Sequence, residues 1–331
     1  MREILNCITI GDEKGVGLEL IFKIWKKNKK NKAVFFILGN YYNISNISKK
    51  LNYNLKFKKI NKSDEAKKYF YKYLPILHLV SKNKKYNSLD SLSISYKLAK
   101  NKLITGIITL PINKNKIISI KKNFIDQTKY FGKLNKKESH MILYSKKIIV
   151  SPITSHIPII KIKYYINKKF IEKRINLIIN SLKNDFKIDN PKIIISGLNP
   201  HSGESGKMGV EEIKVIEPII KKFKKRKVMI DGPVSSDSVF KNYNINKYDC
   251  IITIYHDQAL IPFKILNFND GVNFTSGLDI IRTSPCHGTA YNIAGKNIAD
   301  EKSLYSAILL ANKIYKNRYN DKKIFKPKFF D

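Results

Sequence analysis

Half of the six histidines in this 331-residue chain follow runs of β-branched residues, at the point where each predicted strand ends. These runs deliver His156, His201 and His256, and Asp257 comes directly after the last of them. In an open α/β sheet, ligands gather outside the carboxyl ends of the strands. Since neutral imidazole is a common metal ligand, the pattern indicates a catalytic divalent ion that polarises an alcohol or carbonyl oxygen.

Each of these histidines also has a purely structural alternative. The gaps between them are wide and match no local metal motif, and a single histidine at a strand end is more often a hydrogen-bonded structural residue. Two other histidines are expected to have no role in catalysis. His78 lies in an apolar run and is predicted to pack in the core, and His140 is predicted to lie on a helix.

Two glycine-containing segments are more polar than packing alone requires. Residues 197–204, GLNPHSGE, form a loop before a predicted helix, and the backbone amides of this loop could receive an anion. Helix capping is the alternative role for the loop. Residues 231–237, DGPVSSD, have the composition of a turn, in which capping of the next helix is the more ordinary role for Asp237.

Residues 262–282 carry three polar side chains between apolar stretches that are predicted to be strand or core. Lys264, Asn273 and Arg282 therefore need polar partners, and a phosphate or carboxylate of a substrate would supply them. Plain surface charge is a reasonable alternative for Lys264 in so lysine-rich a chain. It explains Arg282 less well, because arginine is scarce here and this one lies within LDIIRTS.

Short runs rich in Ile, Val and Phe recur along the chain and are apolar on both faces, which predicts buried strands of a parallel or mixed sheet. The predicted strands span residues 4–11, 33–40, 103–114, 147–156, 191–201, 250–258 and 271–283. Amphipathic stretches predict helices over residues 17–28, 89–101, 166–184, 209–222 and 303–315. The lysine-rich segments are interpreted as solvated helices and loops, at residues 49–75 and 161–185. The alternation predicts an α/β protein with helices on both faces of the sheet.

The segment ITIGDEKGVGLEL, residues 8–20, has the order strand, glycine turn, helix. Its glycines do not have the G-x-G-x-x-G spacing, and no acidic residue closes a second strand about 20 residues further on. These departures exclude an ordinary dinucleotide-binding fingerprint. A second glycine-containing segment, HGTAYNIAG at residues 287–295, is the alternative.

The formal net charge of +37 would ordinarily suggest a nucleic-acid or anionic membrane partner. However, only five of the 63 basic residues are arginine, the residue preferred for phosphate and guanine contacts. Abundant Lys, Asn and Ile, whose codons are rich in A and T, explain the basic surface without a binding role. We expect no specific nucleic-acid partner and no membrane span. Three widely spaced cysteines and a first segment without a signal-peptide core predict a cytoplasmic protein.

Seven segments of the chain together resemble the 4-hydroxythreonine-4-phosphate dehydrogenase family of the vitamin B6 pathway, from about residue 5 to about residue 315. They are GDEKGVGLE, TLPINK, SHIPI, SGLNPHSGE, DGPVSSDSVF, YHDQALIPFK and GVNFTSGLDIIRTSPCHGTAYNIAG. This family belongs with the isocitrate and isopropylmalate dehydrogenases. The resemblance implies a two-domain α/β fold of that type, with mixed sheets flanked by helices and a cleft between the domains. The first domain would comprise residues 1–135 and 290–331, and the second, residues 136–289, would carry the metal histidines and the dimer interface.

The resemblance also implies an activity and its cofactors. It implies NAD- or NADP-dependent oxidation of 4-phosphooxy-L-threonine, followed by decarboxylation to 3-amino-2-oxopropyl phosphate in pyridoxal 5'-phosphate biosynthesis. A divalent metal (zinc, magnesium, cobalt or manganese) would be held by His156, His201 and His256. One of these ligands would come from one subunit of a homodimer and two from the other, so that the active site is shared between subunits.

Further site residues follow from the same resemblance. Contacts with the phosphorylated substrate carry over to Thr128, Lys264, Asn273 and Arg282. Gln127 stands where the family has a substrate-contacting histidine; it can donate a hydrogen bond but does not titrate near neutrality.

The family's functional aspartates fall on Asp237 and Asp257, which are the two candidates for the general base. The adenosine-binding loop of the related dehydrogenases resembles HGTAYNIAG, with cofactor contacts predicted at His287, Gly288, Ala290 and Asn292. Asn292 replaces an aspartate of that loop, which removes a charge.

Two alternatives to this function remain at the level of sequence. A paralogous dehydrogenase acting on 4-phospho-threonate or 4-phospho-erythronate would share the metal and phosphate residues, so that discrimination depends on the surroundings of Gln127. A basic nucleic-acid-binding protein on a degenerate dehydrogenase scaffold is the alternative outside enzymology.

Overall fold

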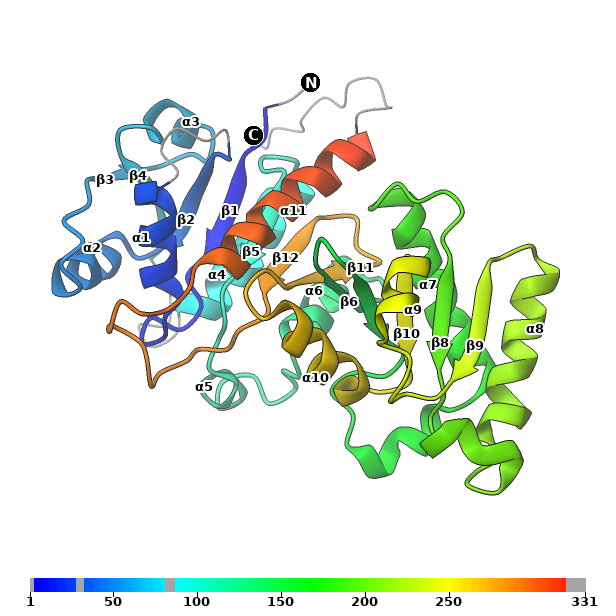
Figure 1. The fold of residues 1–331 in the computed structure, drawn as a ribbon. Coiled ribbons are helices and arrows are strands. Elements are labelled where there is room, and N and C mark those ends of the chain that lie inside the picture. Colours follow the sequence, from blue (N-terminus) through cyan, green and yellow to red (C-terminus); the bar gives the residue numbers. More distant parts are fainter. Residues whose placement is uncertain (1–2, 28–32, 81–86, 320–331) are drawn as a thin grey trace. The chain divides into compact units, whose positions relative to one another are not determined.

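The computed structural model describes residues 3–27, 33–80 and 87–319. The chain forms two compact units: unit 1 combines Met1–Glu138 with Leu278–Asp331, and unit 2 is the continuous segment Ser139–Gly277 (Figure 1). Each unit is an α/β structure that contributes six strands, and this confirms the predicted fold class.

The sheet of unit 1 is parallel between every pair of its described neighbouring strands, in the order β3-β4-β2-β1-β5-β12. These strands are β1 (Asn6–Thr9), β2 (Phe35–Gly39), β3 (Phe57–Ile60), β4 (Leu74–His78), β5 (Gly106–Thr109) and β12 (Arg282–Pro285). The two innermost strands, β2 and β1, are buried along their whole length, as expected of a parallel sheet covered on both faces.

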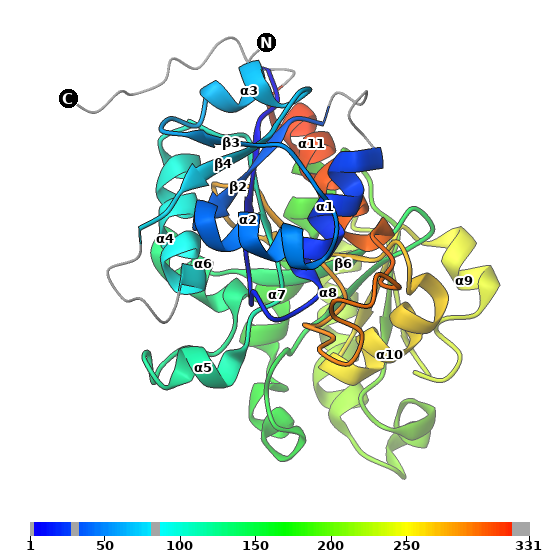
Figure 2. The ribbon, with the colours of Figure 1, turned by 90° about the vertical axis from the view of Figure 1, so that its left-hand side faces the viewer.

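Helices cover both faces of the unit 1 sheet. Helix α1 (Gly17–Lys27) and helix α11 (Lys302–Tyr319) lie together on one face, and helix α4 (Asn87–Lys100) lies on the other with α6 (Gln127–Asn135) beside it (Figures 1 and 2). The remaining described helices are α2 (Tyr41–Lys50), α3 (Glu65–Tyr69) and α5 (Lys114–Ile118).

The sheet of unit 2 is mixed, in the order β11-β6-β7-β10-β8-β9. Its strands are β6 (His140–Tyr144), β7 (Ile149–Pro152), β8 (Ile193–Ser196), β9 (Ile230–Val234), β10 (Cys250–Thr253) and β11 (Val272–Ser276). Strand β6 pairs antiparallel with both β11 and β7, whereas β7, β10, β8 and β9 form a parallel block. The carboxyl ends of this block therefore lie at one edge of the sheet.

The helices of unit 2 connect these strands. Helix α7 packs on β6 and β11, α8 packs on β9, and α10 contacts β7 and β10. The helical segments are η1 (Ile159–Tyr165), α7 (Lys168–Asn184), η2 (Pro200–Gly206), the π-helix η3 (Glu212–Ile216), α8 (Glu217–Lys225), α9 (Asn242–Lys247) and α10 (His256–Asn267). None of the described helices in either unit has the length and hydropathy that a bilayer crossing requires.

Several local expectations need correction. The segment 49–75 contains strand β3 and the start of β4, because alternate side chains of a lysine-rich strand can remain exposed at the sheet edge. His140 begins the buried strand β6 rather than lying on a helix. Segment 271–283 is not one strand, because the chain turns after Ser276 and enters the other unit to form β12.

Two helix predictions also change. The helix expected over residues 209–222 begins with the π-helix at Glu212 and continues as α8 to Lys225. The predicted end of the first helix at Asn28 lies outside the described residues.

The chain returns to unit 1 at Leu278, ahead of the expected residue 290, because β12 pairs in parallel with β5.

Candidate active site

Four predicted site residues of unit 2 follow neighbouring strands of the parallel block. His156 follows β7, His256 follows β10, His201 follows β8, and Asp237 follows β9. The register pairs Thr253 of β10 with Pro152 of β7, so these two strands end at the same level. The topology thus gathers imidazole and carboxylate groups at one edge of one sheet, where α/β proteins bind ligands.

His156 and His256 form a close pair, with ring centroids 5.2 Å apart. The backbone supports this approach, because Thr154 donates its Oγ1 proton to the carbonyl of Ile254 at 2.9 Å. His156 has a positive φ of 53°, a conformation uncommon for a residue with a side chain, which turns the chain after β7. Two of the three histidines that the sequence places at strand ends therefore lie side by side in the structure.

Asp257 is hydrogen-bonded to the ring of the preceding residue, His256, in the first turn of α10. Its Oδ1 accepts from the Nδ1 of His256 at 2.8 Å, which fixes the tautomer so that Nε2 is the ring nitrogen for a metal. A carboxylate behind a ligating histidine is the usual outer-shell arrangement of metal sites. The pair of imidazoles therefore fits a divalent cation chemically. Within residues 3–27, 33–80 and 87–319, however, no group of three His, Cys, Asp or Glu side chains could hold an ion.

His201 lies in a loop whose backbone amides bind a carboxylate of the same chain, in place of an external anion. The carboxylate of Glu212 accepts from the backbone amides of Leu198 and Asn199, at 2.8 Å each, and these are the amides that the sequence offered to a ligand. Glu212 was missed at the level of sequence. The only signal was its place in an acidic pair at the start of a predicted helix, directly after a glycine-rich loop.

Gln258 connects the ends of three strands and was also not singled out. Its Nε2 donates to the Gly197 carbonyl at 3.1 Å and to Ser236 Oγ at 2.8 Å, and its Oε1 accepts from the amide of Ile254 at 3.0 Å. One side-chain amide thus holds together the loops after β8, β9 and β10. The signal in the sequence was its place in YHDQ, next to two predicted site residues.

Asp237 is exposed and does not cap a helix. The next helix, α9, begins five residues later at Asn242, with Lys241 at its N-cap position, so the capping alternative for Asp237 is wrong. A hydrogen bond from Ser235 lowers the pKa of the Asp237 carboxyl, and the electrostatic interaction with nearby His201 lowers it further. Asp237 is therefore ionised at neutral pH and lies within electrostatic reach of a candidate metal ligand.

The other two predicted residues of unit 2 differ in their surroundings. Lys264 is exposed on helix α10, so the strand or core expected for this segment is wrong. Asn273 lies on β11, and its buried Oδ1 accepts no hydrogen bond from the part of the chain that the structure describes. A buried amide oxygen without a partner is costly, which suits a position that meets a ligand.

The guanidinium of Arg282 is a buried cation of unit 1. The residue is only 3% exposed, and it donates to Thr109 Oγ1 from Nε at 3.0 Å and from Nη2 at 2.6 Å. It also donates to Gln127 Oε1 at 3.0 Å and to Thr128 Oγ1 at 3.4 Å. Burial lowers the pKa of Arg282 to about 10, against the opposing effect of the negative charge of Asp126. The group remains charged at neutral pH and is bonded to neutral oxygens.

The first turn of α6 places two of these partners. Asp126 caps the helix by accepting from the amide of Lys129 at 2.8 Å, so that Gln127 and Thr128 are the first helical residues. Gln127 also donates from Nε2 to the Leu110 carbonyl at 3.0 Å. Both the nitrogen and the oxygen of the Gln127 side-chain amide are therefore hydrogen-bonded within the protein. The oxygen faces Arg282 and acts as an acceptor.

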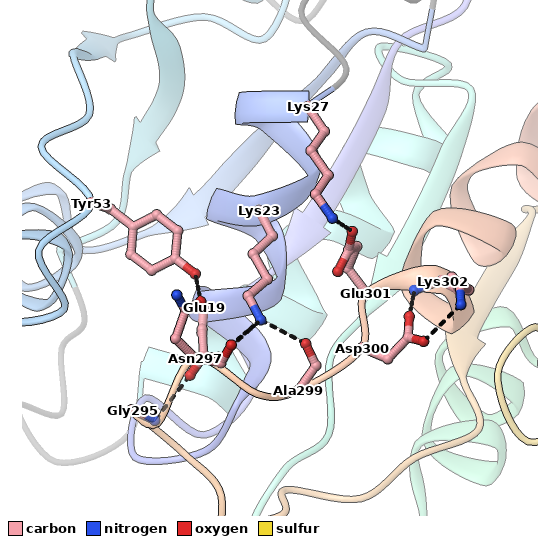
Figure 3. Close-up of polar contacts among 10 residues, drawn as sticks. All are labelled: Glu19, Lys23, Lys27, Tyr53, Gly295, Asn297, Ala299, Asp300, Glu301 and Lys302. Carbon is pink, nitrogen blue, oxygen red and sulfur yellow. Dashed lines mark hydrogen bonds and ion pairs between the residues drawn. The ribbon is translucent and has the colours of Figure 1, made fainter.

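The glycine-containing segment after β12 is fixed to helix α1 (Figure 3). Lys23 donates to the carbonyls of Asn297 and Ala299 at 2.9 and 2.7 Å, and Glu19 accepts from the amide of Gly295 at 2.9 Å. Tyr53 donates to the Asn297 side chain at 2.6 Å. Further contacts in the figure join Lys27 with Glu301 and Lys302 with Asp300.

The predicted cofactor residues lie at the start of this segment. Thr289 accepts from the amide of Val16 at 3.0 Å, and a Cβ on Gly15 would lie only 2.8 Å from the same carbonyl, so a side chain there would force the two segments apart. Four residues were predicted to contact the cofactor. They are His287, half-buried; Gly288, exposed; Ala290, with a φ of 48°; and Asn292, exposed.

Two α/β units with polar groups gathered at strand ends are the architecture of an α/β enzyme. The family model described as "Pyridoxal phosphate biosynthetic protein PdxA" matches residues 31–311, and the chain belongs to this family.

Individual relatives agree with this family. A protein of Aquifex aeolicus named 4-hydroxythreonine-4-phosphate dehydrogenase is 39% identical over 312 residues, which cover 92% of this chain and 96% of that protein. A protein of the same name from Zymomonas mobilis is 33% identical over 325 residues, 94% of this chain and 96% of that protein. The crystal structure of an enzyme of this name from Klebsiella pneumoniae has a TM-score of 0.77 and 26% identity, and the match covers 95% and 98% of the two chains. The relatives favour neither the paralogous dehydrogenase nor the nucleic-acid-binding alternative.

Proposed function

We propose that this protein is a metal-dependent dehydrogenase that uses NAD or NADP to oxidise 4-phosphooxy-L-threonine, with subsequent decarboxylation to 3-amino-2-oxopropyl phosphate in pyridoxal 5'-phosphate biosynthesis. The observation that carries the proposal is the pair formed by His156 and His256, 5.2 Å apart at the ends of two paired parallel strands. Relatives that bear the name of this activity cover almost the whole chain, which supports it.

The imidazoles would hold the metal. His156, His201 and His256 are the proposed ligands, with His256 presenting Nε2 because Asp257 engages its Nδ1 at 2.8 Å. A bound divalent ion (zinc, magnesium, cobalt or manganese) would supply Lewis-acid stabilisation of negative charge on the substrate oxygen during oxidation and decarboxylation. The chain's own contribution is to set the tautomer and the direction of each ring.

The guanidinium of Arg282 would bind an anionic group of the substrate. It is charged, buried and held in one orientation by Thr109 and Gln127, so little side-chain entropy is lost when a phosphate or carboxylate binds. We assign Thr128, Lys264 and Asn273 to the same substrate. Gln127 contributes by orienting the guanidinium, since its Oε1 accepts from Nη2 at 3.0 Å.

The proton of the substrate hydroxyl would pass to a carboxylate. Asp237 and Asp257 are the two candidates, and the structure distinguishes their surroundings. Asp257 is bonded to His256, which suits a role in orienting that ring. Asp237 is exposed, so its carboxylate oxygen is accessible to a substrate hydroxyl, and its lowered pKa means that a proton it accepts is readily passed on to solvent.

The segment 287–295 would bind the adenosine end of NAD or NADP. Gly288 supports this assignment, because no atom lies within 4 Å of the position that a Cβ would occupy there, so a ring could approach its backbone. His287, Ala290 and Asn292 are the other proposed contacts. The anchoring of this segment to α1 by Glu19 would keep the surface in place before the cofactor binds.

We further propose a homodimer with an active site shared between subunits. Large apolar side chains of unit 2 are exposed on the two segments that follow the paired histidines, where an uncovered patch indicates a protein interface. They are Ile159 (75%), Ile160 (76%), Ile261 (59%), Ile265 (78%) and Phe268 (75%). A second copy that covers these segments would complete the histidine cluster. The described cysteines form no disulfide, which is compatible with the proposed cytoplasmic location.

The test is an assay of NADH formation with 4-phosphooxy-L-threonine, with and without a chelator and with each divalent ion restored in turn. We expect turnover that is lost on chelation and restored by metal. Parallel assays with 4-phospho-threonate and 4-phospho-erythronate measure the substrate preference. Faster turnover of either hydroxy acid, or turnover that resists exhaustive chelation, would contradict the proposal.

A further inference from the structure

The loop that carries His201 contains a left-handed turn. Five consecutive residues have positive φ, a region that side-chain-bearing residues avoid because their Cβ approaches the following carbonyl. They are His201 (47°), Ser202 (53°), Gly203 (82°), Glu204 (42°) and Ser205 (56°). Only one of the five is a glycine, so the turn is not favoured by its own sequence and must be held by surrounding contacts.

The carboxylate of Glu212 supplies these contacts. It is 1% exposed, its Oε1 accepts from the amides of Leu198 and Asn199 at 2.8 Å each, and its Oε2 accepts from Asn199 Nδ2 at 2.9 Å. The chain enters the turn directly after these residues. The three hydrogen bonds therefore fix the backbone immediately ahead of His201.

The inside of the turn is moulded on the same carboxylate. A Cβ on Gly203 would lie 2.9 Å from Glu212 Oε2 and 2.8 Å from the Gly209 carbonyl, so only glycine fits at the centre of the turn. On the other side, a Cβ on Gly197 would lie 3.1 Å from Glu212 Oε1. The loop thus packs so closely around the Glu212 carboxylate that neither Gly203 nor Gly197 could carry a side chain without displacing its neighbours.

Glu212 itself has a firm base. It is the first residue of the π-helix η3, which continues without a break into α8, and α8 packs on β9. Helical segments of this kind are frequently found at functional sites. The neighbouring Glu211 differs, since it is half-exposed and accepts from Asn199 Nδ2 at 2.8 Å.

We infer that Glu212 is a positioning residue for the metal ligand His201, which it serves by holding the left-handed turn around its buried carboxylate. The inference rests on the proposed function, in which His201 ligates the metal. Glu212 contacts neither the substrate nor the metal in this scheme. Its effect on affinity arises because the ring of His201 is presented in one direction before the metal binds.

The experiment compares Glu212→Gln with its neighbour Glu211→Gln in the full-length protein. In Glu212→Gln the amide oxygen can keep the two backbone bonds, but its nitrogen would face the donor Nδ2 of Asn199. We expect the affinity for Co²⁺, titrated by its visible absorption, to fall about 10- to 100-fold, the usual cost of losing an outer-shell partner. Glu211→Gln should remain within about threefold of the parent protein.

A second readout follows the loop without metal. Hydrogen exchange of the peptide covering residues 197–206 should accelerate in Glu212→Gln, while melting temperature and NADH affinity stay unchanged. If Glu212→Gln does not fold, Asn199→Ala replaces it, because that change removes the side-chain bonds to the carboxylate and leaves the two backbone bonds. It should weaken Co²⁺ binding several-fold.

The outcomes separate the inference from the proposed function. His201→Ala tests the function: an unchanged Co²⁺ affinity there overturns the metal assignment, and the inference falls with it. If His201→Ala weakens binding but Glu212→Gln does not, the inference alone is overturned, whether or not exchange accelerates. Weaker binding in both variants, with faster exchange at residues 197–206, supports both.

Discussion

Unit 1 and unit 2 prepare their polar groups in different ways. In unit 1 the guanidinium of Arg282 is buried, and Thr109 and Gln127 hold it in one orientation. In unit 2, His156 is exposed and His256 half-exposed, and the centroids of their tilted rings lie 5.2 Å apart. The proposed anion-binding group of unit 1 is thus held by side chains of its own unit, whereas the imidazole groups of unit 2 remain accessible to further ligands.

The largest effect on activity is expected from substitution of a histidine at the strand ends of unit 2. His201→Ala should lower kcat at least about 1000-fold with little change in melting temperature, because an exposed ring is removed and the proposed metal loses a ligand. NADH formation and circular dichroism measure the two quantities. His78→Ala, on strand β4 of unit 1, is the control and should stay active. Activity of His201→Ala within tenfold of the parent would remove the basis for the comparison.

The next largest effect is expected at the buried group. Arg282→Lys should raise the KM for the phosphorylated substrate about 100-fold, because an ammonium cannot reproduce the planar donors that Thr109 and Gln127 orient. Steady-state kinetics with NAD held at saturation measures this KM. The KM for NAD and the affinity for Co²⁺ should not move. An unchanged substrate KM would mean that Arg282 serves the fold alone.

The units should also differ in their response to acid. Burial, with the charge of Arg174, lowers the pKa of His140 in unit 2 to about 3, from 6.5 in the unfolded chain. Since the folded pKa is the lower one, the unfolded state binds more protons between these values, and stability is complete above pH 6.5 and declines as the pH falls.

We expect about 2 kcal/mol of unfolding free energy to be lost between pH 6.5 and pH 5. Denaturant titrations across this range measure the loss, and hydrogen exchange should show it in the peptides of unit 2. His140→Gln, which can keep a hydrogen bond to Ser151, should flatten the pH dependence. An equally steep dependence in this variant would assign the loss to other groups.

The smallest effect is expected where the residues that directly follow the proposed cofactor segment contact α1. Lys23→Met removes the two hydrogen bonds to the carbonyls of Asn297 and Ala299, which should raise the KM for NAD about fivefold. Lys27→Met, which removes an exposed ion pair with Glu301, is the matched control and should change nothing measurable. A KM for NAD that is equal in the two variants would show that this anchoring does not matter for cofactor binding.

The sequence located the strands that precede the three histidines, because runs of β-branched residues mark buried parallel strands. However, β7, β8 and β10 end four to five residues earlier than predicted. His156 and His256 were placed together on this argument. The sequence could not predict the role of Glu212. Its hydrogen bonds to Leu198 and Asn199 depend on a left-handed turn, and only one of the five residues in that turn is a glycine. Left-handed backbone held by a distant carboxylate leaves no periodic signal.

Lys264 shows a second limit. Its segment was predicted to be strand or core because apolar residues dominate it, but it is the helix α10, with Ile261 and Ile265 exposed on it. A helix that is apolar on its outward face imitates a buried strand in a single sequence. His140 was wrongly predicted to lie on a helix. Polar residues precede it, and the antiparallel pairing that makes β6 a strand is with β11, which is distant in the sequence.

The place of β12 affects the order in which the molecule is built. Unit 2 is one uninterrupted stretch, whereas the last strand and last helix of unit 1 are translated only after it. On the ribosome, unit 2 can complete its sheet while unit 1 still has a vacant edge beside β5. Arg282 is the residue that opens the final strand, so a nascent chain gains its buried guanidinium only when nearly all of the polypeptide has emerged.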